Sequence, residues 1–250
     1  MQKVSLTTLK KEYISVDGSY GGNQRWLRMD ADKPNTLSNY GCGLISVNDI
    51  LLHISDQPNT TSKEKYIAAI RDMNRRYFHV LPFLGLSGIM MSFYLRIYLF
   101  MHGKHFKSSY KVKWGVLPHN ILTKIKEMLD NDIPVTLSIG PCLIRGRKKE
   151  LPLYTIEYKT EKSDAFPANE NTGFEKNEVN FCQVNSVKDH YVNVTGIYHF
   201  KDNVENSIIT MLEISSWGKK FYINYDEYIN FVKKYDNFLF SNILYIRPKR

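Results

Sequence analysis

The order of hydrophobic periodicities along the chain constrains its fold most. Apolar residues recur at helical spacing in the first half, whereas alternating and β-branched apolar runs dominate after about residue 135. The predicted helices cover 42–55, 62–78, 119–130 and 226–235, and the predicted strands cover 135–139, 151–158, 191–200, 207–215 and 237–246. Helices followed by strands favour the α+β class, in which a helical half packs against an antiparallel sheet.

No linker divides the helical half from the strand half, so we expect one domain over residues 1–250. Residues 13–41 are rich in Gly, Asn, Asp and Ser, and we interpret 1–41 as an irregular N-terminal lead-in. Residues 159–185 include a long polar run with Pro and Gly, which predicts a surface insertion.

Residues 81–101 form the most hydrophobic stretch, whose length approaches the roughly 20 residues of a membrane-spanning helix. Pro82, Gly85, Gly88 and Arg96 interrupt this stretch, and ionisable residues are rare within lipid. We therefore expect a core helix that is covered on all sides, with a membrane anchor as the alternative.

The positive charge of the chain is uneven. Residues 1–150 carry 22 Lys and Arg against 12 Asp and Glu, whereas residues 151–250 carry 12 against 13, for a net charge of +9. A basic chain invites a nucleic-acid hypothesis. However, the sequence lacks zinc-finger spacing, RNA-recognition aromatic motifs and a basic helix with heptads. The basic clusters at 145–149 and 247–250 are typical of a solvated loop and a terminus, so we expect no nucleic-acid partner.

Three cysteines, Cys42, Cys142 and Cys182, are spread along the chain. Such an odd and sparse set argues against a disulfide framework and favours a reducing compartment. Residues 1–20 also lack the apolar core of a signal peptide, so we expect a cytoplasmic protein. Cys142 and Cys182 have neither a helix start nor a nearby histidine, and we expect both to be inert.

Cys42 opens a predicted helix between Gly41 and Gly43. The positive end of a helix dipole lowers the pKa of a thiol placed there, and flanking glycines let a substrate approach the backbone. The alternative is a buried cysteine that acts as a small hydrophobic residue.

His190 begins an apolar, β-branched strand and can present a ring nitrogen to a groove. Further along, Ser215 ends a strand just before Trp217. In a Cys–His enzyme a polar side chain orients the imidazole, and a bulky ring shields that hydrogen bond from water. The alternatives are a strand histidine without a task and a tryptophan that packs over a turn.

In their order along the chain, Gly41-Cys42-Gly43, His190-Tyr191-Val192 and Ser215-Ser216-Trp217-Gly218 resemble the papain-like cysteine peptidase superfamily, in particular bacterial C39-like peptidases. In those proteins Cys-Gly opens the central helix, a His-Tyr-Val strand supplies the base, and Asp-Pro-Trp-Gly or Asn-Ser-Trp-Gly carries the orienting residue. The resemblance touches about 21–55 and 185–230. It implies a papain-like fold in which the nucleophile's helix faces the sheet across a groove.

Two positions depart from the family pattern. Ser215 stands where the family has Asp or Asn, so it can accept the imidazole N–H but supplies no charge. The family's oxyanion-hole Gln usually stands a few residues before the Cys, where this chain has Thr36. Gln24 is the replacement if 25–38 form an inserted loop, and Asn39 is a second candidate.

The resemblance implies a thiol-dependent hydrolase, a cysteine peptidase or amidase that acts on a peptide, amide or ester and uses no cofactor or metal. The implied catalytic residues are Cys42, His190, Ser215 and Gln24, and the implied substrate-binding residues are Gly41, Gly43, Asn39 and Trp217. An acyl transferase and a catalytically silent papain-fold binding module are the alternatives. We expect no membrane association, and the sequence does not indicate an oligomeric state.

Overall fold

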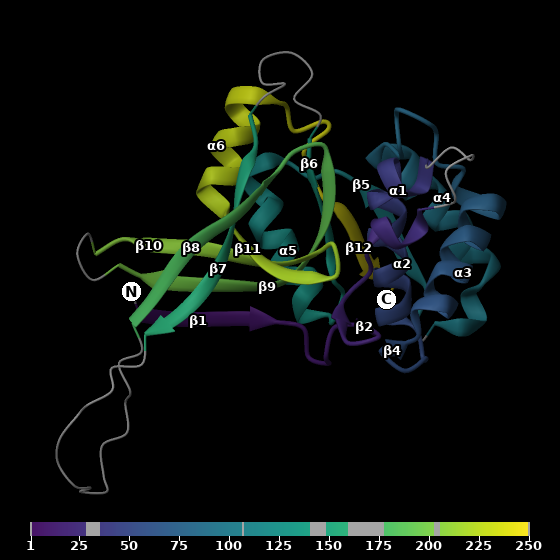
Figure 1. Ribbon diagram of the computed structural model, residues 1–250, viewed down its shortest axis with the longest axis horizontal. Coiled ribbons are helices and arrows are strands. Elements are labelled where there is room, and N and C mark those ends of the chain that lie inside the picture. The colour runs from purple at the N-terminus through teal and green to yellow at the C-terminus, as the bar shows by residue number, and fades with distance from the viewer. Residues whose placement is uncertain are drawn as a thin grey trace, which may run out of the picture.

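A computed structural model describes residues 2–28, 36–106, 108–140, 149–159, 178–202 and 206–249. The chain is α+β with a mostly antiparallel sheet, which confirms the fold class indicated by the periodicities. Figure 1 shows α1–α4 gathered at one end of the sheet. The helices are α1 (Thr36–Tyr40), α2 (Cys42–Ile54), α3 (Lys63–Met73), α4 (Gly88–Met101), α5 (Ile121–Asp130) and α6 (Tyr225–Tyr235).

Most strands belong to one sheet. The strands are β1 (Gln2–Thr8), β2 (Ser15–Val16), β3 (Ser19–Tyr20), β4 (Thr60–Thr61), β5 (Tyr110–Trp114), β6 (Val135–Ile139), β7 (Leu151–Lys159), β8 (Glu178–Val187), β9 (His190–Lys201), β10 (Ile208–Ser216), β11 (Lys219–Asn224) and β12 (Leu244–Pro248). The main sheet runs β1-β9-β10-β11-β7-β8, and β6 also pairs with β9. Strands β12 and β5 form a separate two-stranded ribbon, and β3-β2-β4 form a small third sheet.

The long strand β9 organises the molecule. Its first half pairs with β6, where His190 lies opposite Ile139, and its second half pairs with β1, where Gly196 lies opposite Thr8. Strand β10 occupies the other edge of β9. Because β9 also packs against α2, its beginning lies where the sheet meets the helices.

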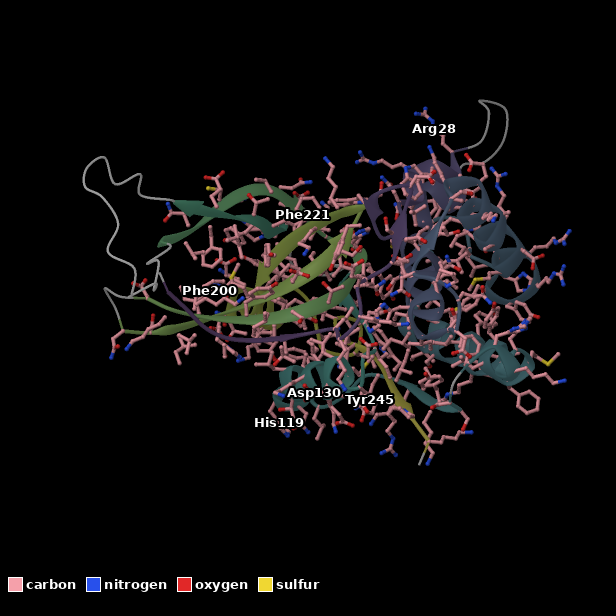
Figure 2. All side chains as sticks on the ribbon, turned by 90° about the horizontal axis from the view of Figure 1, so that it is seen from below. Arg28, His119, Asp130, Phe200, Phe221 and Tyr245 are labelled. Carbon is pink, nitrogen blue, oxygen red and sulfur yellow. The ribbon has the colours of Figure 1, made fainter. Side chains whose placement is uncertain are left out.

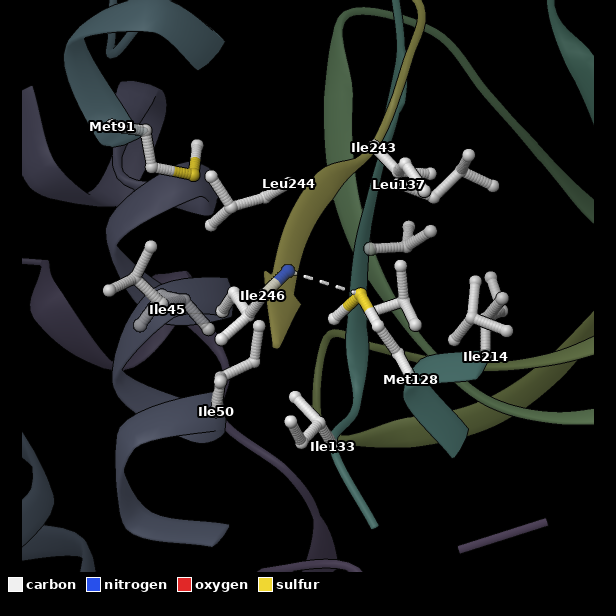
Figure 3. Packing of buried hydrophobic residues seen from close by; sticks show 14 of the residues in the cluster. Ile45, Ile50, Met91, Met128, Ile133, Leu137, Ile214, Ile243, Leu244 and Ile246 are labelled. Carbon is white, nitrogen blue, oxygen red and sulfur yellow. Dashed lines mark hydrogen bonds between the residues drawn. The ribbon is translucent and has the colours of Figure 1, made fainter. Parts of the chain in front are cut away.

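The helices and the sheet share one hydrophobic core. Figure 3 shows β12 between α2 and the strand β6. Leu244 and Ile246 of β12 are buried in the same apolar cluster as the α2 side chains. The backbone N–H of Ile246 donates a hydrogen bond to the Met128 sulfur of α5 at 3.4 Å. The continuous burial of apolar area across this junction fixes α2 against the sheet.

Several expected elements have different boundaries. Residues 1–41 are not irregular throughout, since β1 is a regular edge strand of the main sheet. The expected insertion over 159–185 is in part the strand β8, while residues 160–177 lie outside the described residues. The expected strand over 237–246 begins only at Leu244, because the Asn237 side chain accepts the backbone N–H of Leu239 at 2.9 Å and closes a turn.

The apolar stretch 81–101 contains a shorter helix than expected, α4, and that helix is covered on one side only. Met91, Leu95 and Leu99 are buried at helical spacing, whereas Ile89 and Phe100 are exposed. The expectation of a helix covered on all sides was therefore wrong. Within the part of the chain that the structure describes, no helix has the length and apolar character needed to cross a membrane.

Candidate functional site

Helix α2 begins at Cys42, as predicted, and the two neighbouring glycines serve the packing of this helix. A Cβ on Gly41 would lie 2.3 Å from the Leu37 carbonyl oxygen of α1. A Cβ on Gly43 would lie 2.8 Å from the Met91 side chain. Neither glycine is among the residues that line the cavity at Cys42. The structure thus gives both glycines a packing role in place of the expected contact with substrate.

The surroundings of the Cys42 thiol favour its neutral form. Burial of the sulfur raises the pKa of Cys42, and hydrogen bonding to the backbone at Tyr191 and Gly43 only partly opposes this effect. The nearby Asp189 carboxylate raises the pKa of the thiol further. The helix start alone led us to expect a lowered pKa, but desolvation is the larger effect here.

His190 is the first residue of β9, and it is buried. The Trp217 ring stacks on its imidazole, with centroids 4.8 Å apart and planes inclined by 23°. Its Nε2 lies 2.9 Å from the Ser216 hydroxyl oxygen. Burial lowers the pKa of His190 to about 4, so the imidazole is neutral near pH 7 and able to accept a proton.

The side chain that holds His190 is Ser216, the residue after the one expected. The Ser215 hydroxyl donates instead to the backbone carbonyl of Tyr20 at 2.8 Å. Neighbouring residues of a strand point to opposite faces, so Ser215 fastens the N-terminal segment while Ser216 faces the imidazole. The structure thus brings the Ser-Trp-Gly motif to His190, but the polar contact is one residue later than predicted.

Trp217 and Gly218 form the two-residue turn between β10 and β11. Their φ angles are +51° and +74°, which suits a type I′ hairpin turn. A left-handed backbone is unusual for a bulky residue such as Trp, and it persists only where the surroundings enforce it. The Asn23 side chain donates to the Trp217 carbonyl at 2.9 Å, and the indole covers His190. The turn therefore holds a strained residue directly over the candidate base.

Cys42 and His190 line one cavity of about 530 Å³. The cavity brings together residues that are far apart in the sequence, from α1, α2, β6, β9 and the loops before α4 and β12. No hydrogen bond joins the Cys42 sulfur to the His190 ring in the described structure. Catalytic contacts are often loose without substrate and tighten when substrate binds.

The walls of this cavity are largely apolar. They include Phe83, Leu84, Ile89, Trp114, Leu239 and Phe240. Phe83 has a φ of +66° and leaves 85% of its side chain exposed at this cavity. Exposed apolar side chains gathered at a cavity are typical of a ligand-binding site. Sequence reasoning did not assign these residues to the site, because they come from two loops, the first turn of α4 and the end of β5, which share no local motif.

The two oxyanion-hole candidates lie in different places. Asn39, at the end of α1, lines the cavity together with Cys42. Gln24 lines a much smaller space behind the His190 ring, where its Oε1 is buried without a hydrogen-bond partner among the described residues. Thr36 is the first residue of α1 and is not among the residues that line either space. Of the two candidates, only Asn39 shares a cavity with Cys42.

A buried polar network joins α2, which carries Cys42, to β9, which carries His190. The Ser46 hydroxyl, one helical turn after Cys42, donates to the Asn193 side-chain oxygen at 2.5 Å. The Asn193 amide donates back to the Ser46 carbonyl at 3.0 Å. Asn193 follows His190 by three residues on β9, so these bonds fix the relative position of the two elements close to the site.

The same network anchors the N-terminal segment. The buried carboxylate of Asp49 accepts hydrogen bonds from the Tyr13 and Tyr66 hydroxyls, at 3.0 and 2.5 Å, and from the Gly22 backbone at 3.0 Å. Burial raises the pKa of Asp49 to about 6, although these three donors favour the ionised form. Asp49 thereby holds the segment that carries Gln24 against α2.

Cys182, by contrast, lies half-buried on β8, where a hydrogen bond with Glu157 raises its pKa. It is not among the residues that line the cavity of Cys42 and His190. Cys142 lies outside the described residues. Comparisons of the chain with protein-family models, with curated proteins and with solved structures gave no match.

Proposed function

We propose that this protein is a thiol-dependent hydrolase or acyl transferase of papain-like fold, with Cys42 as nucleophile and His190 as base. The observation that carries the proposal is the meeting of Cys42 at a helix start and His190 at a strand start in one cavity. A helix-borne cysteine, a strand-borne histidine and a Trp-Gly turn over the imidazole together suit nucleophilic catalysis better than any one of them does.

The pair starts as a neutral thiol and a neutral imidazole. Since Nε2 of His190 lies against Ser216, Nδ1 is the nitrogen available to the cavity. His190 takes the thiol proton at Nδ1 as the Cys42 sulfur attacks the carbonyl carbon, while the Nε2–H donates to Ser216. Ser216 brings no negative charge, so the stacked Trp217 ring is the group that stabilises the transient imidazolium.

The remaining steps follow from this assignment. The backbone N–H of Cys42, in the first turn of α2, and the side chain of Asn39 are the donors for the developing oxyanion. When the carbonyl re-forms, the bond to the leaving amine or alcohol breaks, and that group takes the proton from His190. Water or another acceptor then attacks the thioester on Cys42 and releases the acyl group. An apolar cavity favours a substrate with an apolar acyl or side-chain group beside the reacting carbonyl.

The test uses p-nitrophenyl esters of increasing acyl chain length. The wild-type protein should release nitrophenol with a burst and carry an acyl adduct that peptide mapping places on Cys42, and longer chains should react better than acetate. Cys42→Ala should abolish both signals, and His190→Ala should lower the rate by roughly 10²- to 10⁴-fold. Cys182→Ala is the matched control and should retain full activity, because this thiol lies elsewhere.

Hydrolysis that survives Cys42→Ala would refute the mechanism. A second probe is decanoate, a ten-carbon fatty acid that has no leaving group. If decanoate binds in the cavity but no ester acylates Cys42, the protein is the catalytically silent binding module. Two observations favour this binding module over an enzyme. The pKa of the Cys42 thiol is raised, and no hydrogen bond joins Cys42 to His190 in the described structure.

A further inference from the structure

A second, larger cavity has a strongly basic lining. It occupies about 910 Å³ and is formed by α4, α5 and the β5–β12 ribbon together with the loop before β5. It shares no lining residue with the cavity at Cys42. Among the described residues that line it, none is acidic and six are cationic, namely Arg96, Lys111, Lys113, Lys124, Arg247 and Lys249.

The register of the ribbon places like charges opposite each other. Lys111 pairs with Arg247, and Lys113 pairs with Tyr245, so these side chains share one face. The ribbon's last contact adds Lys249, whose backbone N–H donates to the Ser109 carbonyl at 2.7 Å. Like charges directly opposite in an antiparallel pair are destabilising. The opposed cations therefore do not stabilise the fold. A bound anion would offset their repulsion, which gives a physical reason for their position.

Most of these cations form no ion pair with a carboxylate among the described residues. Within the described ranges, no carboxylate forms an ion pair with Lys111, Arg247 or Lys249. Glu127 of α5 pairs with Lys124 and accepts the Tyr245 hydroxyl, and the charge of the nearby Arg247 helps to lower the pKa of this carboxyl. The described lining thus carries an excess of positive charge.

An aromatic and apolar wall accompanies the charges. The Tyr245 ring has Lys113 Nζ 5.3 Å and Lys124 Nζ 5.2 Å from its centroid. Figure 2 shows Tyr245 beside the α5 helix, whose Glu127 carboxylate accepts the Tyr245 hydroxyl. Phe100 and Phe106 supply apolar surface to the same cavity. The volume is within the range of small-molecule sites, and all six cations line the same hollow.

We propose that this basic cavity binds a small organic polyanion, a nucleoside di- or triphosphate in its chemistry. The phosphates neutralise the opposed Lys111 and Arg247, and the ring of the ligand packs against Tyr245, Phe100 or Phe106. The site is separate from Cys42 and does not depend on the proposed thiol chemistry.

The test is isothermal titration of the full chain at low ionic strength with ATP, inorganic pyrophosphate and adenosine as probes. ATP should bind more tightly than pyrophosphate, adenosine should give no measurable heat, and added salt should weaken both anions. Lys111→Gln and Arg247→Gln should each raise the Kd for ATP about tenfold, because each removes a charged contact. Lys126→Gln is the matched control, since Lys126 lies on α5 but pairs with Asp130 and is not among the lining residues.

The two variants also report on the unliganded protein. Because each removes one of two opposed like charges, thermal unfolding without ligand should occur at an unchanged or higher temperature. Weaker ATP binding then reflects the lost charge and not a misfolded chain. The absence of binding by both anions, or ATP binding that neither variant changes, would overturn the proposal. A single-stranded oligonucleotide that binds more tightly than ATP through Lys111 and Arg247 would identify a nucleic-acid surface and would also overturn it.

Discussion

The environment of His190 determines what kind of base it is. Its burial disfavours the imidazolium, Ser216 offers it a neutral hydroxyl in place of a carboxylate, and the surroundings of Cys42 disfavour the thiolate. A resting thiolate–imidazolium ion pair needs the opposite conditions. The site is instead built for proton transfer during attack, so any activity should be present above the His190 pKa of about 4 and be lost as the pH falls through it.

Ser215 and Ser216 provide a matched pair of substitutions at neighbouring positions. Ser216→Ala removes the partner of His190 Nε2 and should lower kcat by about 3- to 10-fold through loss of one hydrogen bond, and because this bond is buried it should also cost about 1 kcal/mol of unfolding free energy. Ser215→Ala removes the bond to the Tyr20 carbonyl and should cost about 1 kcal/mol of unfolding free energy with little change in kcat.

Ester hydrolysis and urea unfolding of both variants measure this split. If Ser215→Ala lowers kcat more than Ser216→Ala does, the orienting role belongs to Ser215 after all. The sequence predicted Cys42, His190 and the Ser-Trp-Gly turn as one group, because each lies at an element start or end. It could not show which serine meets the imidazole, because a register shift of β10 against β9 at Glu213–Ile214 is set by pairing with a distant strand.

At the scale of elements, the close packing of Gly88 of α4 against the Trp114 ring of β5 sets the position of one cavity wall. A Cβ on Gly88 would lie 2.1 Å from the Trp114 ring of β5, and Trp114 lines the cavity at Cys42. Position 88, where α4 begins, therefore has to be free of a side chain for the β5–β12 ribbon to pack beside the helix.

Gly88→Ala should destabilise the protein by roughly 1–3 kcal/mol through overpacking, and it should also change hydrolysis of long-chain esters by displacing Trp114. The control is Gly103→Ala, where a Cβ would meet nothing within 4 Å, so stability should stay the same or rise slightly. Urea unfolding of both variants decides the matter. Equal stabilities for the two would show that Trp114 can move aside without cost.

The sequence predicted helices better than strands for a physical reason. The helix over 42–55 agrees closely with α2, because its apolar residues are continuous and it lies wholly within the core. The strands β1 and β8 were missed, because part of each is exposed and their pairing partners lie far away in the sequence or beside a polar run. Strand identity depends on the neighbour as much as on the residues themselves.

At the scale of the whole molecule, two buried histidines make stability depend on pH. Burial lowers the pKa values of His190 and His53 to about 4 each, and Lys11 contributes to the shift of His53 although Asp132 opposes it. Between pH 4 and 6.5 the unfolded chain then binds more protons at these positions than the folded chain. Their contribution to stability is therefore complete above pH 6.5 and is lost as the pH falls towards 4. Asp49, with its raised pKa, opposes part of this loss.

We expect the free energy of unfolding to fall between pH 7 and pH 4.5, and His53→Gln to reduce that fall by about 2–3 kcal/mol. The measurement is urea unfolding of wild type and variant at both pH values. The control is His119→Gln, which also removes one imidazole but at an exposed position. It should leave the pH dependence of stability unchanged. A His53→Gln protein with the same pH dependence as the wild type would contradict the assignment.

The pairing of β1 with β9 has a consequence for synthesis on the ribosome. Residues 2–8 emerge long before their partners at 196–201, and at 5–20 residues per second the delay is on the order of 10–40 seconds. During that time β1 has no strand to pair with, and Cys42 has no His190 beside it. The same late strand closes the sheet and brings His190 to the cavity of Cys42, so under the proposed mechanism a partly made chain carries the thiol without the base that activates it.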